Sequence, residues 1–151
     1  LDFALEMLRG AQQRGISASF VQGDAGRMPL PDASVQAVTC GFALRNFVNL
    51  AEVLQEMGRV LAPEGRLMIL EVFEPKNPIL KVLHSFHFNK VVPFLGRLLS
   101  DEQAYAYLPR SVAYLPPDPE FFAMFDKAGF IHVKRKVLLF GAAQMITGIK
   151  R

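Results

Sequence analysis

The sequence predicts an α/β fold in which a mostly parallel sheet carries helices on both faces. Residues 34–40 (SVQAVTC) are short, apolar and β-branched, and residues 66–72 (RLMILEV) form a second short apolar run. Both runs are typical of buried strands of a parallel sheet. Between them, residues 49–61 place apolar side chains at helical spacing, which predicts an amphipathic helix over the sheet.

The N-terminal residues predict one further helix and one further strand. Residues 3–14 favour a helix, and Gly15 is a typical helix stop. Residues 16–22 (ISASFVQ) alternate between apolar and polar side chains, which predicts a strand. Asp2 stands just before the helix. A carboxylate at that point of a nucleotide-binding α/β fold accepts hydrogen bonds from ribose hydroxyls, and an N-cap role is the alternative.

Two loops at the carboxyl ends of predicted strands form the candidate site, because open α/β sheets bind their ligands there. Residues 41–46 (GFALRN) follow one strand, and Asp24 and Ala25 follow another. A carboxylate beside a small residue can accept a hydrogen bond from an adenine amino group. An Asx-turn that only shapes the loop is the alternative for Asp24.

Arg45 and Glu71 are the charged candidates at this edge. The guanidinium of Arg45 stays protonated, so it cannot act as an ordinary base, but in a dry pocket it can stabilise and orient a phenolate. A ring carbon becomes nucleophilic when the neighbouring hydroxyl loses its proton, so a guanidinium that stabilises the phenolate favours reaction at an aromatic carbon. Glu71, near the carboxyl end of its strand, can position the substrate or Arg45. A structural ion pair is the alternative for both residues.

Residues 75–115 are predicted to form a helical lid or insertion. Residues 76–100 carry basic side chains without an acidic one, and their helical apolar face is interrupted at Pro93. Such a segment can lie on anionic lipid, and a lid packed on the domain is the alternative. His84 and Tyr105 are candidate substrate contacts, because an imidazole can accept a proton and a tyrosine offers a ring edge and a hydroxyl. Each also has a structural alternative.

The composition is that of an ordinary globular α/β domain. The chain has 151 residues, of which 51% are hydrophobic and 21% are charged, and its net charge is +3. No basic run combines with aromatic residues as in a nucleic-acid platform, so no nucleic-acid partner is expected. The single cysteine, Cys40, excludes an internal disulfide and a cysteine-based metal site, and it fits a reducing compartment such as the cytoplasm. No metal site is expected.

Three stretches of the chain resemble a known family. They are GDAGRMPLPDASVQAVTCGFALRN at 23–46, EVLQEMGRVLAPEGRLMILEVFEP at 52–75 and SDEQAYAYLPRS at 100–111. They resemble the UbiE-type C-methyltransferases of ubiquinone and menaquinone biosynthesis, which use S-adenosylmethionine and have the class I methyltransferase fold. The similarity covers nearly all of the chain, and the GFALRN and SDEQAYAYLPRS blocks are the most specific to the quinone family.

The resemblance implies a cofactor, S-adenosylmethionine, and a substrate, a prenylated quinol. Asp2 would contact the cofactor ribose, and Asp24 and Ala25 would contact the adenine. Gly41 stands where serine is common in the family, so only a backbone contact with the cofactor is expected there. The expected catalytic residues are Arg45 and Asn46, and the expected substrate-binding residues are Glu71, His84 and Tyr105.

The C-terminal residues predict one helix, and the resemblance implies a pair of strands after it. Asp118 is expected to cap a helix that Gly129 ends. Residues 130–140 and 142–149, hinged at Gly141, resemble the final antiparallel strand pair of the Rossmann-like class I fold. In that fold the last strand inserts between the two strands that precede it.

We expect residues 1–151 to be a single methyltransferase domain that lacks its first two strands. The chain begins with Leu1, and the family's first strands and Gly-rich turn would lie upstream of it. Asp2 and residues 16–22 are therefore expected to be weakly held, or to pair unusually across the gap in the sheet.

Three other functions stay open from the sequence. A nonenzymatic remnant that binds a partner or a membrane would explain the missing Gly-rich turn. A nucleotide-linked oxidoreductase is a second alternative, since Asp2 would also serve NAD, although the GFALRN and APEGR blocks weigh against it. A methyltransferase of a different small molecule is the third. Peripheral membrane attachment and a homo-oligomer are both compatible with the family.

Overall fold

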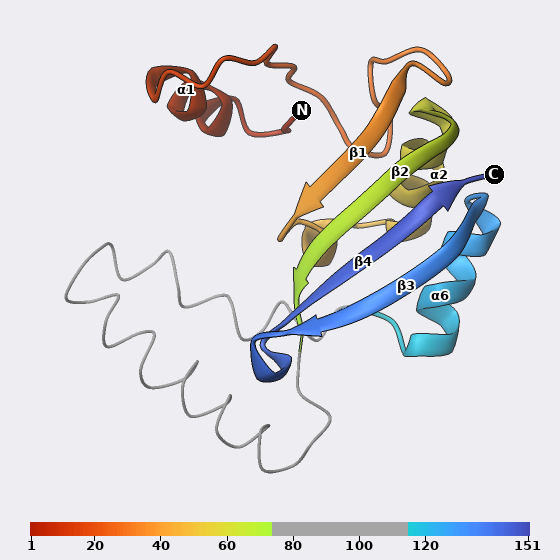
Figure 1. Ribbon diagram of the computed structural model, residues 1–151. Coiled ribbons are helices and arrows are strands. Elements are labelled where there is room, and N and C mark those ends of the chain that lie inside the picture. The colour runs from red at the N-terminus through yellow and green to blue at the C-terminus, as the bar shows by residue number, and fades with distance from the viewer. Residues whose placement is uncertain (74–114) are drawn as a thin grey trace.

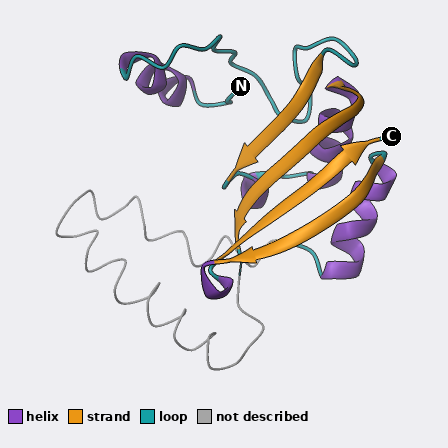
Figure 2. Cartoon of the chain, in the orientation of Figure 1, coloured by secondary structure: helices purple, strands orange, loops and turns teal. Residues whose placement is uncertain are grey.

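The structure is a computed structural model that describes residues 1–73 and 115–151. Its centre is a sheet of four strands in the order β1-β2-β4-β3 (Figures 1 and 2). β1 and β2 are parallel, whereas β4 is antiparallel to both β2 and β3. The strands are β1 (Val35–Gly41), β2 (Leu61–Val72), β3 (Phe130–Leu138) and β4 (Ala143–Lys150).

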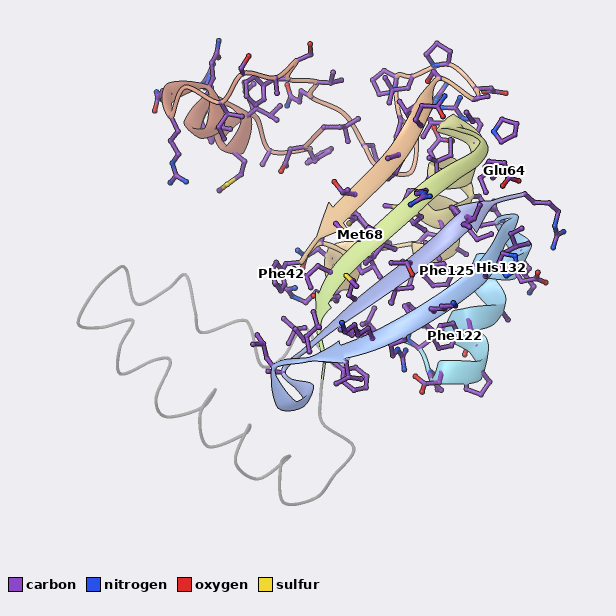
Figure 3. The ribbon with its side chains drawn as sticks, viewed as in Figure 1. Phe42, Glu64, Met68, Phe122, Phe125 and His132 are labelled. Atoms are coloured by element: carbon purple, nitrogen blue, oxygen red, sulfur yellow. The ribbon has the colours of Figure 1, made fainter. Side chains whose placement is uncertain are left out.

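Two helices pack on the sheet, and both lie on the same face. Figure 1 shows α2 and α6 together behind the strands, while α1 lies apart from the sheet. Met68, which is 43% exposed, lies on the face that these helices leave open (Figure 3). The prediction of helices on both faces is therefore not met within the described residues. The helices are α1 (Leu5–Gln13), α2 (Leu50–Val60) and α6 (Asp118–Lys127).

The hydrophobic core fills the space between the sheet and these two helices. The periodic apolar side chains of α2 account for its orientation, and Asn49 caps the helix by accepting a hydrogen bond from the backbone N–H of Glu52 at 3.3 Å. α6 contributes three aromatic rings, of which Phe121 meets both Phe122 and Phe125 edge to face. Phe122 and Phe125 are labelled in Figure 3. The core residues are Leu44, Val53, Leu54, Met57, Leu61, Leu67, Ile69, Phe121, Phe125, Ala128, Phe130 and Ile146.

The predicted arrangement of the last two strands is confirmed. β4 lies between β2 and β3 and is antiparallel to both. The turn between β3 and β4 is a short 3-10 helix, Leu139–Gly141, which ends at Gly141 with a φ of 99°. Glycine adopts this left-handed conformation at little cost, which explains why the chain turns at Gly141.

The strand predicted over residues 16–22 does not form. Its backbone makes only an isolated bridge, between Asp2 and Gln22, and α1 buries no side chain. A strand is held by its ladder partners rather than by its own alternation, and within the described residues no strand lies beside this segment. The weak attachment of Asp2 and residues 16–22 agrees with the expectation from the sequence.

Three further predictions have separate outcomes: one is corrected, one lies outside the described residues, and one concerns membrane-spanning helices. Asp118 is the first residue of α6 rather than its cap, because Pro117 takes the N-cap position. The predicted lid, 75–115, lies almost entirely outside the described residues, as do His84 and Tyr105. Within the part of the chain that is described, none of the helices is long and apolar enough to cross a bilayer.

Candidate functional site

The carboxyl ends of the parallel strands β1 and β2 meet at one edge of the sheet. Gly41 at the end of β1 lies opposite Leu70 of β2, and the N–H of Phe42 donates to the carbonyl of Leu70 at 2.7 Å. Phe42 has a φ of 56°, which is uncommon for an aromatic residue and turns the chain sharply out of the strand (Figure 3). The 3-10 helix η1 (Leu44–Asn46) follows and is anchored by the buried Leu44.

This turn places Arg45 against Glu71. The Nη1 of Arg45 donates to Oε1 of Glu71 at 2.5 Å, and the backbone N–H of Arg45 donates to Oε2 at 3.4 Å. Oε1 also accepts the N–H of Val72 at 2.8 Å. Arg45 is 8% exposed and Glu71 is fully buried. Arg45 and Glu71, which are 26 residues apart in sequence, therefore form one buried ion pair at the predicted edge of the sheet.

The pair sets the electrostatics of this edge. Removing two charges from water is costly, and their mutual attraction repays the cost when the geometry is good and further hydrogen bonds complete it. Glu71 receives donors from Arg45 and Val72, which meets that condition. A guanidinium held in this way keeps a fixed orientation in surroundings of low dielectric constant.

Cys40 lies beside this pair at the end of β1. Burial and the negative charge of Glu71 together raise the pKa of the Cys40 thiol to about 11. The thiol is therefore protonated at neutral pH and is a poor nucleophile. The structure supports no role for it in the chemistry of this edge.

Gly41, the last residue of β1, and Asn46, the last residue of η1, are both exposed. A Cβ added at Gly41 would meet no atom within 4 Å, so there is open space at the end of β1. The N–H of Asn46 donates to the carbonyl of Ala43 at 2.9 Å, which closes the 3-10 turn. The side chain of Asn46 is not brought into the buried pair by any hydrogen bond found for the described residues.

Asp2 and Asp24 come from neighbouring segments of backbone. The N–H of Gly23 donates to the carbonyl of Asp2 at 3.1 Å, one residue before Asp24. The Oδ1 of Asp2 accepts the N–H of Ala4 at 2.8 Å, and the N-cap of α1 is Ala4 rather than Asp2. The Oδ1 of Asp24 accepts the N–H of Gly26 at 2.8 Å, which is the Asx-turn that the sequence offered as an alternative.

The loop after Asp24 is held by two side chains of α2, which the sequence analysis did not single out. Glu56 accepts the N–H of Met28 at 2.7 Å, and Arg59 donates to the carbonyl of Met28 at 3.1 Å. Arg59 also donates to Glu56 at 2.7 and 2.8 Å and to Asp32 at 2.5 Å. The hydrogen bonds from Arg59 lower the pKa of Glu56. The Glu-x-x-Arg spacing, which places both residues on one helix face, was the signal that could have revealed this clamp.

Gln144 is a second residue that the sequence analysis missed. It lies on β4 opposite Glu71 of β2 and is 2% exposed. An amide within the apolar run of residues 142–149 was the available signal, since buried strands seldom carry one without a partner.

Comparisons with known proteins agree with this architecture. The chain is 40% identical to a demethylmenaquinone methyltransferase of Roseiflexus castenholzii, over 100% of this chain and 65% of that protein. It is 41% identical to a demethylmenaquinone methyltransferase of Deinococcus radiodurans, over 99% of this chain and 64% of that protein. The chain thus spans slightly less than two thirds of these relatives.

Solved structures of low sequence identity show the same fold. A putative methyltransferase from Bacillus halodurans matches 99% of this chain and 80% of its own, with a TM-score of 0.63 and 18% identity. A SAM-dependent methyltransferase from Thermotoga maritima matches 99% of this chain and 71% of its own, with a TM-score of 0.64 and 19% identity. The described residues therefore have the Rossmann-like class I methyltransferase fold.

The model of the ubiE/COQ5 methyltransferase family matches residues 1–150, nearly the whole chain. The match covers both loops of the candidate edge and the pair formed by Arg45 and Glu71. The chain belongs to the ubiE/COQ5 methyltransferase family.

Proposed function

We propose that this chain is part of an S-adenosylmethionine-dependent methyltransferase that methylates a ring carbon of a prenylated quinol. The observation that carries the proposal is the buried pair of Arg45 and Glu71 at the carboxyl edge of the sheet. Family membership and the names of its relatives, demethylmenaquinone methyltransferases among them, support the same substrate class. Peripheral membrane attachment and a homo-oligomer stay predictions.

The residues of the N-terminal loops fit the cofactor. Asp2 and Asp24 are both exposed, and each has one carboxylate oxygen engaged by a backbone N–H, which leaves acceptor capacity for ribose hydroxyls or an adenine amino group. The open space at Gly41 lies at the end of β1, where ligands of open α/β sheets bind. When bound, S-adenosylmethionine supplies an electrophilic methyl carbon.

The chain's own contribution is to make the ring carbon nucleophilic. Arg45 offers a fixed positive charge and planar donors to a ring oxygen that has lost its proton, which stabilises the phenolate. Glu71 holds the guanidinium in place, so the donors need no reorganisation when the charge develops. No residue is assigned as the general base.

Binding of S-adenosylhomocysteine, measured by calorimetry on the 151-residue chain, tests the cofactor site. We expect binding to be weakened roughly tenfold by Asp24→Asn, because the change keeps the Asx-turn acceptor but removes the charge that strengthens the hydrogen bond. Asp126→Asn is the matched control, since Asp126 is an exposed residue of α6. It should leave the affinity unchanged.

Two results would count against the proposal. If the chain does not bind S-adenosylhomocysteine, these residues do not form a cofactor site in this chain. That result would favour the alternative of a nonenzymatic protein that binds a partner or a membrane. If both variants bind as the unchanged chain does, Asp24 does not contact the adenine. Transfer of a labelled methyl group to 1,4-dihydroxynaphthalene, abolished by Arg45→Met, would establish the reaction class.

A further inference from the structure

Three polar side chains are buried among the described residues, and they lie together. Arg45, Glu71 and Gln144 are 8%, 0% and 2% exposed, respectively. Arg45 and Glu71 bind one another. The Oε1 of Gln144 is also buried, but within the described residues it has no hydrogen-bond partner.

The position of Gln144 relative to the ion pair follows from the register of the sheet. Gln144 of β4 is the direct antiparallel partner of Glu71 of β2, and such partners project from the same face with Cβ atoms about 5 Å apart. Both side chains also bind the backbone of Val72. Glu71 accepts its N–H at 2.8 Å, and the Nε2 of Gln144 donates to its carbonyl at 3.5 Å. The amide therefore lies immediately beside the ion pair.

The carbonyl of Val72 also settles which end of the amide lacks a partner. A carbonyl oxygen can only accept, so the end of the amide that faces it must be the NH2 group. The remaining atom is a buried acceptor that has no hydrogen-bond partner within the described residues. Burial of such a group is unfavourable, and an apolar side chain of similar length would avoid the penalty. Packing alone does not explain an amide at this position.

We propose that Gln144 is a specificity-determining residue for the substrate ring, whose Oε1 accepts a hydrogen bond from a ring hydroxyl. The proposal rests on the proposed function, because it places the ring beside Arg45 and Glu71. A hydroxyl group can donate to Oε1, whereas a quinone carbonyl or a methyl ether cannot. The orphaned acceptor would thus make this edge prefer the reduced, hydroxylated ring, because a site built around one hydrogen bond discriminates strongly against a ligand that lacks it.

Ring binding by the 151-residue chain tests the proposal without the cofactor. The probes are 1,4-dihydroxynaphthalene, kept anaerobic, and 1,4-dimethoxynaphthalene, which has the same ring oxygens but no hydroxyl hydrogen. We expect the dihydroxy compound to bind roughly tenfold more tightly to the unchanged chain. Gln144→Met, which removes the amide at similar length, should bring the two dissociation constants together.

Two controls separate this role from packing. Met145→Leu changes the adjacent residue of β4, which faces the opposite side of the sheet, and should keep the preference for the dihydroxy ring. The thermal unfolding midpoint of Gln144→Met should equal or exceed that of the unchanged chain, because the variant removes an unsatisfied buried acceptor and loses only the long, 3.5 Å hydrogen bond to Val72. If the dimethoxy ring binds weakly only because its methoxy groups do not fit, the preference for the dihydroxy ring would persist in Gln144→Met. If the preference depends on the hydrogen bond to Gln144, it would disappear in that variant.

Three outcomes would overturn the proposal. They are a preference for the dihydroxy ring that survives Gln144→Met, a marked fall in the unfolding midpoint of that variant, and no binding of either ring. The methyltransferase proposal is judged separately, by the binding of S-adenosylhomocysteine. A chain that binds the cofactor product but shows any of these three outcomes would refute only the role of Gln144.

Discussion

The carboxylate of Glu71 is fully buried, so its energetic value depends on the cation that it meets. Breaking a buried pair by removing one charge leaves the other charge unbalanced, whereas replacing both by apolar groups is often tolerated. The same pair is thus both a structural element and the proposed source of phenolate stabilisation. Stability and activity should respond differently to substitutions within it.

We predict that Glu71→Gln lowers the free energy of unfolding by about 3–5 kcal/mol, because the buried guanidinium of Arg45 loses its counter-charge. Chemical denaturation measures the effect. Glu6→Gln is the matched control, because its ion pair with Arg9 is exposed to solvent and should contribute less than about 1 kcal/mol. A loss below about 1 kcal/mol in Glu71→Gln would show that the pair is not the balanced unit described above.

Cys40 predicts a pH dependence of stability. Its pKa is raised from 9.0 to about 11 in the folded state. The thiol therefore contributes stability that is fully present below pH 9 and is lost as the pH rises from 9 towards 11, because the unfolded chain then releases a proton that the folded chain retains. The loss should not exceed roughly 3 kcal/mol. Between pH 9 and 11, the free energy of unfolding measured by chemical denaturation should fall less steeply with pH for Cys40→Ala than for the unchanged chain. An identical slope would show that the thiol of Cys40 is not the group responsible.

At the scale of elements, α2 connects the core to the loop that leads from Asp24 into β1. Glu56 and Arg59 bind both backbone polar groups of Met28, and the carbonyl of Arg59 accepts the N–H of Ala33 at 2.9 Å. The hydrophobic face of the helix packs on the sheet, so its polar face is free to fix this loop. The candidate adenine-contacting residues thus lie directly before a loop that this helix holds in place.

Arg59→Ala should speed amide hydrogen exchange at Met28 roughly tenfold or more, because the carboxylate of Glu56 that accepts this N–H loses the guanidinium that orients it. Exchange in β2 and β4 should be unchanged, since these strands make no hydrogen bond to the loop. Arg9→Ala, which removes an exposed arginine of α1, serves as the control. Unaltered exchange at Met28 in the Arg59 variant would refute the clamp.

At the scale of the whole molecule, the described residues divide into a packed unit and an appended segment. The sheet, α2 and α6 share one core. In residues 1–22, none of the side chains of α1 is buried. The isolated β-bridge of this segment joins Asp2 to Gln22, so both of its partners lie within the segment itself. The contribution of this segment to stability should therefore be small.

Deleting residues 1–22 should change the free energy of unfolding by less than about 1 kcal/mol, because little apolar surface is exposed by the deletion. Thermal and chemical denaturation of the shortened chain measure this. Deleting residues 144–151 is the contrasting control, since it removes β4 from between β2 and β3 and should abolish cooperative unfolding. A large loss on removing residues 1–22 would mean that the segment packs on the core in solution.

Local sequence patterns predicted the main elements of the packed unit and their approximate bounds. The helix predicted over 49–61 is α2, and the strands predicted over 34–40 and 66–72 overlap β1 and β2. β1, however, is a partly exposed edge strand of the described sheet rather than the buried strand that was predicted. These signals are local, because helical spacing, alternation and turn residues act over a few positions. The resemblance to a family added the antiparallel insertion of β4, which no local pattern encodes.

The sequence placed Arg45 and Glu71 at the same edge, but their contact and the position of Gln144 beside them depend on the tertiary fold. Arg45 and Glu71 are 26 residues apart, and Gln144 joins them from a strand at the other end of the chain. Their proximity follows from strand register, which depends on the whole sheet. The same dependence explains why residues 16–22 alternate like a strand but form none. A strand requires a neighbour to complete its hydrogen bonds, and the pattern of a segment cannot supply that neighbour.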